Sequence, residues 1–103
     1  MYDDKRTDIL VKYGFIGPIM IELKLLDNDE IQNDSKRVEY KAKLNQYIKA
    51  NHCDFSNYII FQRRNETQNA INKYNNLVEE YNSIKNLKVE FINCYIPDKN
   101  KKV

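Results

Sequence analysis

Short apolar runs separated by polar segments are the first pattern in this chain. Three of them, at 18–26, 57–62 and 87–96, are rich in β-branched and other apolar residues and are typical of strands. A weaker run at 7–12 has the same bias. Residues 13–17 contain both glycines of the chain, and glycine supplies the positive φ that tight turns require. The pattern therefore predicts a hairpin in which the first two runs pair antiparallel.

Two segments carry apolar residues at helical spacing. The first spans about 35–50 with Ser35 as its cap, and its apolar stripe consists of Val38, Tyr40, Leu44, Tyr47 and Ile48. Its cationic residues are expected largely on the outer side, where they would face solvent or, alternatively, phosphate: Lys36, Arg37, Lys41, Lys43 and Lys49. The second helix spans about 66–85 and has the clearer stripe: Ala70, Ile71, Tyr74, Leu77, Val78, Tyr81 and Ile84. Residues 27–37 are expected to form a polar loop.

The order of these elements predicts the fold class. A hairpin is followed by helix, strand, helix and strand, and strand–helix–strand crossovers favour parallel neighbours with right-handed connections. We therefore expect a single α/β domain, 1–103, whose mixed sheet contains an antiparallel hairpin and two crossover helices. Residues 1–6 would lead into the domain, and residues 97–103 would form a polar tail.

Composition narrows the function classes. The 103 residues carry a net charge of +2, so nucleic-acid binding would need a local patch rather than a basic field over the whole chain. Cys53 and Cys94 suit free thiols in a reducing compartment. One histidine, His52, and no Cys-x-x-Cys motif argue against zinc. No apolar run reaches membrane-spanning length and the N-terminus lacks a signal core, so we expect a cytoplasmic protein with no membrane partner.

Two charges interrupt the apolar run at 18–26. Glu22 and Lys24 stand two residues apart, so strand alternation places them on one face, about 7 Å apart along the strand. A carboxylate and an ammonium in a half-buried strand are costly unless they pair or hold a ligand. The sequence leaves both interpretations open, a structural ion pair and a functional site.

A second carboxylate is expected beside this pair. If residues 13–17 form the hairpin loop, Asp8 lies directly opposite Glu22 on the same face of the sheet. Two facing carboxylates repel each other unless a cation sits between them. Lys24 is one candidate for that cation and a divalent metal is the other.

This constellation resembles a known family. Asp8, thirteen intervening residues and then Glu22-Leu23-Lys24 at the end of an apolar strand, followed by a helix and a strand, are similar to the PD-(D/E)XK nuclease superfamily. The resemblance covers about residues 6–62. It implies a restriction-endonuclease-like fold whose N-terminal part is truncated, because family members usually have a helix and another strand before the acidic strand. The chain would then be a fragment of a longer protein or a trimmed member, and Thr7 replaces the proline of the family motif.

The resemblance implies a metal-dependent nuclease that hydrolyses phosphodiester bonds, with DNA favoured over RNA. Asp8 and Glu22 would hold Mg²⁺ or Mn²⁺ together with the backbone carbonyl of Leu23, and the metal would neutralise the phosphate and lower the pKa of the attacking water. Lys24 would orient that water or stabilise charge in the transition state. Gln46 matches a polar residue that the family often carries on the following helix.

Arginines and sheet edges suggest the partners. Arg6, two residues before Asp8, and Arg63, with Arg64 after it at the end of a strand, are candidate phosphate contacts. Nucleic acid is the expected partner, and an exposed sheet edge would also permit a homodimer or further domains of a longer chain. The alternative function is a catalytically inactive nuclease-fold module for protein binding or dimerisation. A third interpretation is an unrelated α/β domain whose charges form a structural ion cluster.

Overall fold

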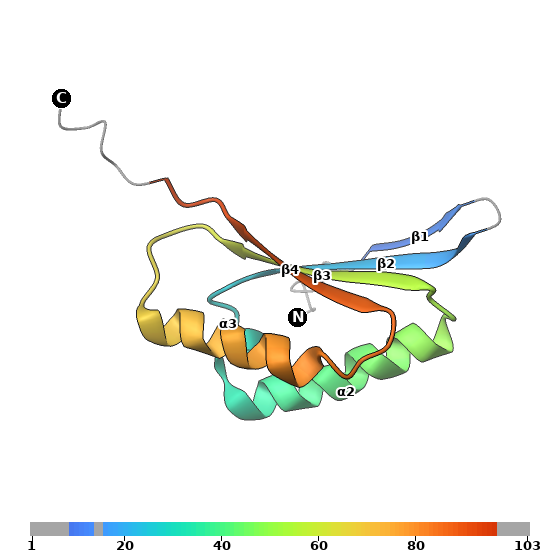
Figure 1. The fold of residues 1–103 in the computed structure, drawn as a ribbon, viewed down its shortest axis with the longest axis horizontal. Coiled ribbons are helices and arrows are strands. Elements are labelled where there is room, and N and C mark those ends of the chain that lie inside the picture. The colour runs from blue at the N-terminus through green and yellow to red at the C-terminus, as the bar shows by residue number, and fades with distance from the viewer. Residues whose placement is uncertain (1–8, 14–15, 97–103) are drawn as a thin grey trace, which may run out of the picture.

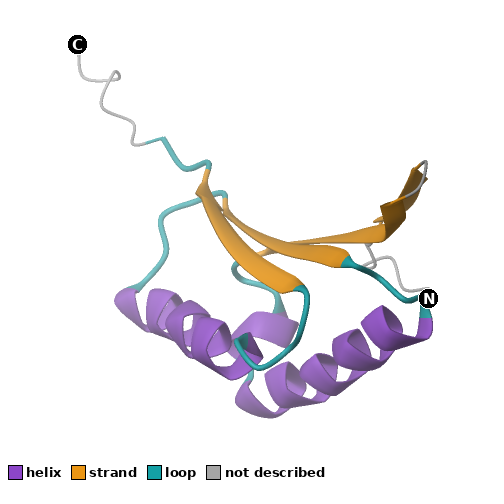
Figure 2. Cartoon of the chain, turned by 45° about the vertical axis from the view of Figure 1, so that its right-hand side comes forward, coloured by secondary structure: helices purple, strands orange, loops and turns teal. Residues whose placement is uncertain are grey.

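A four-stranded sheet and two long helices form two layers, with both helices against the same face of the sheet (Figure 1, Figure 2). This computed structural model describes residues 9–13 and 16–96, with side chains from residue 18 onward. The α/β class predicted from the sequence is confirmed. None of the described helices is long and apolar enough to cross a membrane.

The strands follow one another across the sheet in chain order, from β1 to β4. Strand β2 runs antiparallel to β1 and parallel to β3, and β4 is parallel to β3. Their bounds are β1 Ile9–Tyr13, β2 Ile16–Leu25, β3 Phe55–Gln62 and β4 Leu87–Asn93. Strand β4 is therefore shorter than the predicted run at 87–96.

The pairing of β1 with β2 starts in the register expected from the sequence. Ile9 pairs with Ile21, and the next two positions pair in step. This is the register in which Asp8 is predicted to face Glu22. Asp8 itself lies outside the described residues, so its position opposite Glu22 stays a prediction.

The link between these strands differs from the predicted loop at 13–17. Strand β1 continues to Tyr13 and β2 already begins at Ile16, and these two residues pair with each other. The register shifts by one residue between Val11 and Tyr13, as it does at a β-bulge or a similar irregularity. This shift compensates for the closer spacing of the two strands along the chain, so the expected register is kept beyond it.

The helices α2, Asp34–Ala50, and α3, Gln68–Tyr81, cover one face of the sheet. Each connects a strand to its next neighbour in the same direction across the sheet, and right-handed crossovers then place both helices on the same side. The β2 residues that face them are buried: Met20, Glu22 and Lys24, followed by Leu26. The alternate β2 residues, on the face that no described helix covers, are half-buried: Ile19, Ile21, Leu23 and Leu25.

The predicted polar loop at 27–37 is in fact mostly helical. A one-turn helix, α1, spans Asp29–Gln32 and is capped by Asn28, whose side chain accepts a hydrogen bond from the backbone of the first turn. Helix α2 follows directly, and its cap is Asn33 rather than the predicted Ser35. Two asparagine caps close together thus turn a polar segment into two helix starts.

Helix α3 is also shorter than the predicted 66–85. Thr67 caps it, accepting a hydrogen bond from the backbone N–H of Ala70, and the helix ends at Tyr81. Ile84 lies beyond that end but is still buried, as its place in the apolar stripe predicted.

Arg37 was expected on the outer side of its helix and is instead one of the most buried side chains. Its guanidinium donates to both carboxylate oxygens of Glu80 on α3, at 2.8 and 3.0 Å, and also to Asp34 and to the Ile31 carbonyl. The neighbouring Val38, expected in the apolar stripe, is exposed. Arg37 therefore holds α1, α2 and α3 together, although its position was predicted to face solvent or phosphate.

Candidate functional site

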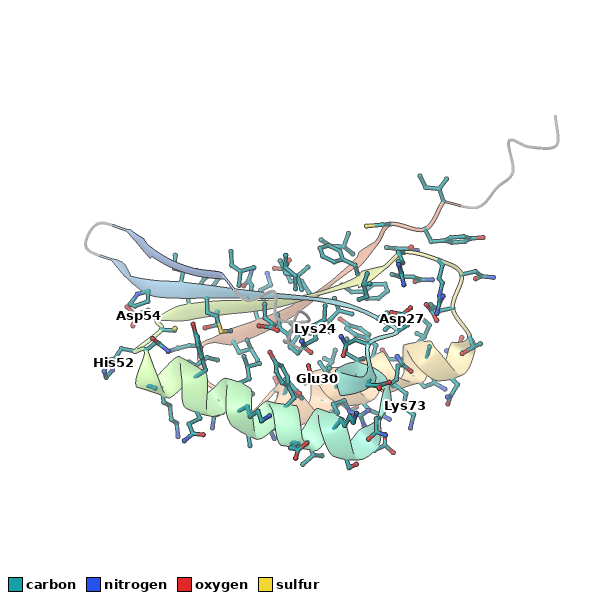
Figure 3. All side chains as sticks on the ribbon, turned by 180° about the vertical axis from the view of Figure 1, so that it is seen from behind. Lys24, Asp27, Glu30, His52, Asp54 and Lys73 are labelled. Atoms are coloured by element: carbon teal, nitrogen blue, oxygen red, sulfur yellow. The ribbon has the colours of Figure 1, made fainter. Side chains whose placement is uncertain are left out.

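The charged residues of β2 lie in the layer between the sheet and the helices. Glu22 and Lys24 are both buried on the helix-facing side of the strand. Figure 3 shows Lys24 beneath the sheet with Glu30 of α1 next to it. The prediction that Glu22 and Lys24 share one face is confirmed, and the face is the covered one.

Lys24 bridges two carboxylates. Its Nζ lies 3.1 Å from Glu22 Oε2 and 2.8 Å from Glu30 Oε1. The same ammonium lies over the ring of Tyr40, 4.7 Å from the centroid, which is a cation–π geometry. We call Glu22, Lys24 and Glu30 the ion triad.

Helix α1 brings Glu30 to this position. The backbone N–H of Asn28 donates to the Leu25 carbonyl, so the chain turns sharply after β2. Ile31 is fully buried, and the Gln32 side chain donates to the Leu26 carbonyl, which fixes α1 against the end of the strand. Glu30 then reaches back toward Lys24.

Two tyrosines border the ion triad. Burial, together with the nearby charge of the Glu22 carboxylate, raises the pKa of Tyr40 far above its usual range. Burial also raises the pKa of Tyr58 well above its usual value. The Tyr58 ring lies 6.0 Å from that of Tyr40, and its buried hydroxyl has no hydrogen-bond partner among the described residues. Both phenols are therefore neutral at physiological pH and can donate a proton in a hydrogen bond.

An open pocket of about 240 Å³ adjoins the ion triad. Its lining comes from α1 and the first turns of α2 and includes Glu30 and Tyr40, which both contact Lys24. Two lysines, Lys36 and Lys43, also line it. The pocket is thus an opening, lined mainly by polar residues, that leads from the surface toward the buried Glu22–Lys24 pair.

The other predicted site residues are dispersed or outside the described part of the chain. Arg6, like Asp8, lies outside the described residues. Leu23 lies between the two charged residues of β2 and pairs in register with Ile59 of β3. Gln46 is exposed on α2, and the helical rotation of about 240° from Tyr40 to Gln46 turns it away from the ion triad.

Arg63 lies at the end of β3, where it is exposed. Its Nη2 lies 3.4 Å from Asp27 Oδ2, and Arg64 approaches the same carboxylate oxygen at 2.9 Å. Both arginines are thus at the carboxyl end of the parallel strands, with a surface ion pair rather than a buried one. His52 lies in the turn after α2, at the far end of the domain from this cluster (Figure 3).

Glu30 and Tyr40 are site residues that the sequence analysis missed. The signal for Glu30 was present, because Asn28 followed by two acidic residues is typical of a helix start. For Tyr40 the helical stripe predicted the correct face, but it was assigned to the core alone.

The carboxylates of the ion triad are oxygen ligands of the type that hard cations such as Mg²⁺ prefer. Glu22 and Glu30 are carboxylates on either side of one ammonium, and Mg²⁺ commonly uses one or two carboxylates with waters and substrate phosphate. No group of three or more His, Cys, Asp or Glu side chains that could hold a metal occurs among the described residues. Asp8, the predicted partner of Glu22, is not one of them, so this ligand stays a prediction.

Comparison of the chain with protein-family models, with curated proteins and with solved structures finds no match.

Proposed function

We propose that this chain is a metal-dependent nuclease domain of the PD-(D/E)XK type that hydrolyses phosphodiester bonds, in DNA by preference. The observation that supports the proposal is the pair Glu22 and Lys24, buried side by side on a strand and covered by the helix that follows it. The finer fold assignment, a restriction-endonuclease-like domain, is part of the same proposal.

Energetics favour a functional explanation of the ion triad over a purely structural one. Removing a carboxylate and an ammonium from water costs several kcal/mol per ion, on the order of what their attraction returns. Hydrophobic residues of the same volume would fill the space between the sheet and α2 equally well. A chain that keeps Glu22 and Lys24 there, beside an open pocket, is more simply explained if the charges act on a ligand.

Each residue of the site would have a distinct task. Glu22 would hold Mg²⁺ with Asp8 and the Leu23 carbonyl, and the bound ion would neutralise the phosphate and acidify the attacking water. Lys24 carries a positive charge beside that carboxylate and would stabilise the charge that develops on the phosphate oxygens. Tyr40, whose ring lies against the ammonium of Lys24, would help to hold the Lys24–Glu22 pair in one orientation.

A cleavage assay tests the proposal. Single-stranded and duplex DNA and RNA are incubated with the wild-type chain in Mg²⁺ or Mn²⁺, and with Glu22→Gln, which keeps the size of the side chain. We expect DNA cleavage that falls by about 100-fold or more in Glu22→Gln. Glu90→Gln is the matched control, because Glu90 is also a strand glutamate paired with a lysine but lies on the sheet edge. Cleavage that is absent in the wild type, or equal in the two variants, contradicts the proposal.

A catalytically inactive binding module is the second candidate function. It is favoured by the sheet face that no described helix covers, where apolar side chains of β2 and β3 are half-buried: Ile21, Leu23, Ile59 and Phe61. For this candidate, calorimetric titration should detect no Mg²⁺ binding, and light scattering should detect a dimer or a complex. Metal-dependent cleavage with a monomeric mass excludes it.

A further inference from the structure

The proposed function requires Lys24 to meet a phosphate, but its side chain is only 3% exposed. Three groups surround its ammonium among the described residues: Glu22, Glu30 and the ring of Tyr40. Among the described residues, these are the groups that a ligand would displace to reach Lys24.

Exposure identifies the group that can move. The Glu22 side chain is as buried as that of Lys24, at 3%, whereas the Glu30 side chain is 32% exposed. Tyr40 also lines the pocket, but it is uncharged and its ring packs against the core, 6.0 Å from the ring of Tyr58. Glu30 is thus the carboxylate of the ion triad that is partly exposed and also lines the pocket.

We propose that Glu30 is the gate of the site: its carboxylate occupies the place on Lys24 that a phosphodiester oxygen takes when nucleic acid enters the pocket between α1 and α2. The inference rests on the proposed function and adds where the substrate enters and what it displaces. A phosphodiester carries one negative charge, as does a carboxylate, so the exchange leaves the charge around Lys24 unchanged. The ligand class is a nucleic-acid strand, bound through its phosphates.

The local structure allows this exchange without unfolding. The backbone of α1 is fixed by the Asn28 cap and by the Gln32 side chain, so a rotation of the Glu30 side chain into the pocket is sufficient. Lys36 and Lys43 line the same pocket, together with the carboxylates of Asp29 and Glu39, and the two lysines would receive the neighbouring phosphates. Lys36 makes an exposed contact of 3.7 Å with Asp29, which costs little to break.

The test compares Glu30→Gln with Asp29→Asn. Each variant removes one negative charge from α1 and from the pocket lining, but only Glu30 contacts Lys24. Binding of a short fluorescein-labelled DNA strand is followed by anisotropy in EDTA, so no cleavage occurs. We expect Glu30→Gln to bind about tenfold more tightly than wild type and Asp29→Asn to gain about twofold or less. Equal gains in the two variants, or weaker binding by Glu30→Gln, overturn the gate.

A second measurement needs no ligand. Labelling by acetic anhydride, read by mass spectrometry, should modify Lys24 faster in Glu30→Gln than in wild type, with no change in Asp29→Asn. If Glu30→Gln is unfolded by circular dichroism, Glu30→Asp replaces it, because the shorter side chain releases Lys24 while keeping the charge. An unchanged labelling rate of Lys24 in a folded variant contradicts the inference.

The outcomes separate the gate from the nuclease. A wild-type chain that binds DNA, gains affinity in Glu30→Gln and cuts nothing retains the gate and refutes the nuclease. A chain that cuts DNA but shows the same affinity in Glu30→Gln and Asp29→Asn retains the nuclease and refutes the gate. Running the same anisotropy with an RNA strand and with free inorganic phosphate as competitor shows whether the strand or the phosphate alone is recognised.

Discussion

Replacing Lys24 by methionine should be among the most destabilising single changes in this domain. The substitution keeps most of the side-chain volume but leaves the Glu22 carboxylate buried without the ammonium at 3.1 Å. Breaking a buried ion pair by removing one partner costs about 3–5 kcal/mol. Glu30 adds at most about 1 kcal/mol, since its side chain is 32% exposed and can turn to water.

Two further variants check that magnitude. The double variant Glu22→Gln/Lys24→Met removes both buried charges, so its stability should return to within about 1–2 kcal/mol of wild type. Lys88→Met is the matched control, because Lys88 is paired with a strand glutamate at 3.4 Å but is 64% exposed, and it should cost about 1 kcal/mol or less.

Urea denaturation followed by circular dichroism measures all of these free energies of unfolding. A domain of this size has only about 5–15 kcal/mol of stability, so a loss of the expected size moves the midpoint clearly. A loss below about 1 kcal/mol for Lys24→Met, or a double variant as unstable as the single one, would refute the electrostatic account of the ion triad.

Three other predictions follow from buried or strained groups. Arg37→Ala should lower the free energy of unfolding by about 2–4 kcal/mol in urea denaturation, because it removes the buried guanidinium that joins α2 to Glu80 on α3. The folded state raises the pKa values of three tyrosines, Tyr40, Tyr58 and Tyr81. Above pH 10 the unfolded chain therefore releases phenol protons that the folded chain keeps. The free energy of unfolding should fall by up to about 1.4 kcal/mol per pH unit for each of these tyrosines. Stability is then unaffected by these groups below pH 10, and ultraviolet difference spectroscopy should detect their ionisation together with unfolding, not before it. His52→Gly should raise the free energy of unfolding by about 0.5–1 kcal/mol, and with it the melting temperature, because His52 has a φ of 54° in the turn after α2. An unchanged or lower melting temperature would show that the backbone at His52 is not strained.

The sequence predicted the parts of the fold that depend on local periodicity. The alternation in β2 placed Glu22 and Lys24 on one face because side chains of a strand alternate whatever packs on them. The apolar stripe of α3 likewise predicted the burial of Leu77 and Tyr81. The direction in which that face would point, toward the helices, depends on the handedness of two crossovers and was not assigned.

The features that the sequence did not predict depend on distant or context-dependent contacts. Arg37 stands among lysines on a helix surface, and its burial is explained by Glu80, which lies 43 residues away in the chain. The contact of Glu30 with Lys24 requires that Asn28 start a helix within a segment composed of loop-forming residues. In the hairpin, a one-residue register shift compensated for the shorter link between the strands, so the predicted register was correct although the predicted loop bounds were not.

The position of a bound metal tests the central claim most directly. Crystals of the chain soaked in Mn²⁺ and measured for anomalous scattering would locate the ion without any assumption about activity. We predict an anomalous peak within coordination distance, about 2.0–2.2 Å, of a Glu22 carboxylate oxygen, with Lys24 beside it. Density that shows the ion triad unchanged, and no Mn²⁺ at Glu22, would contradict the proposed nuclease site.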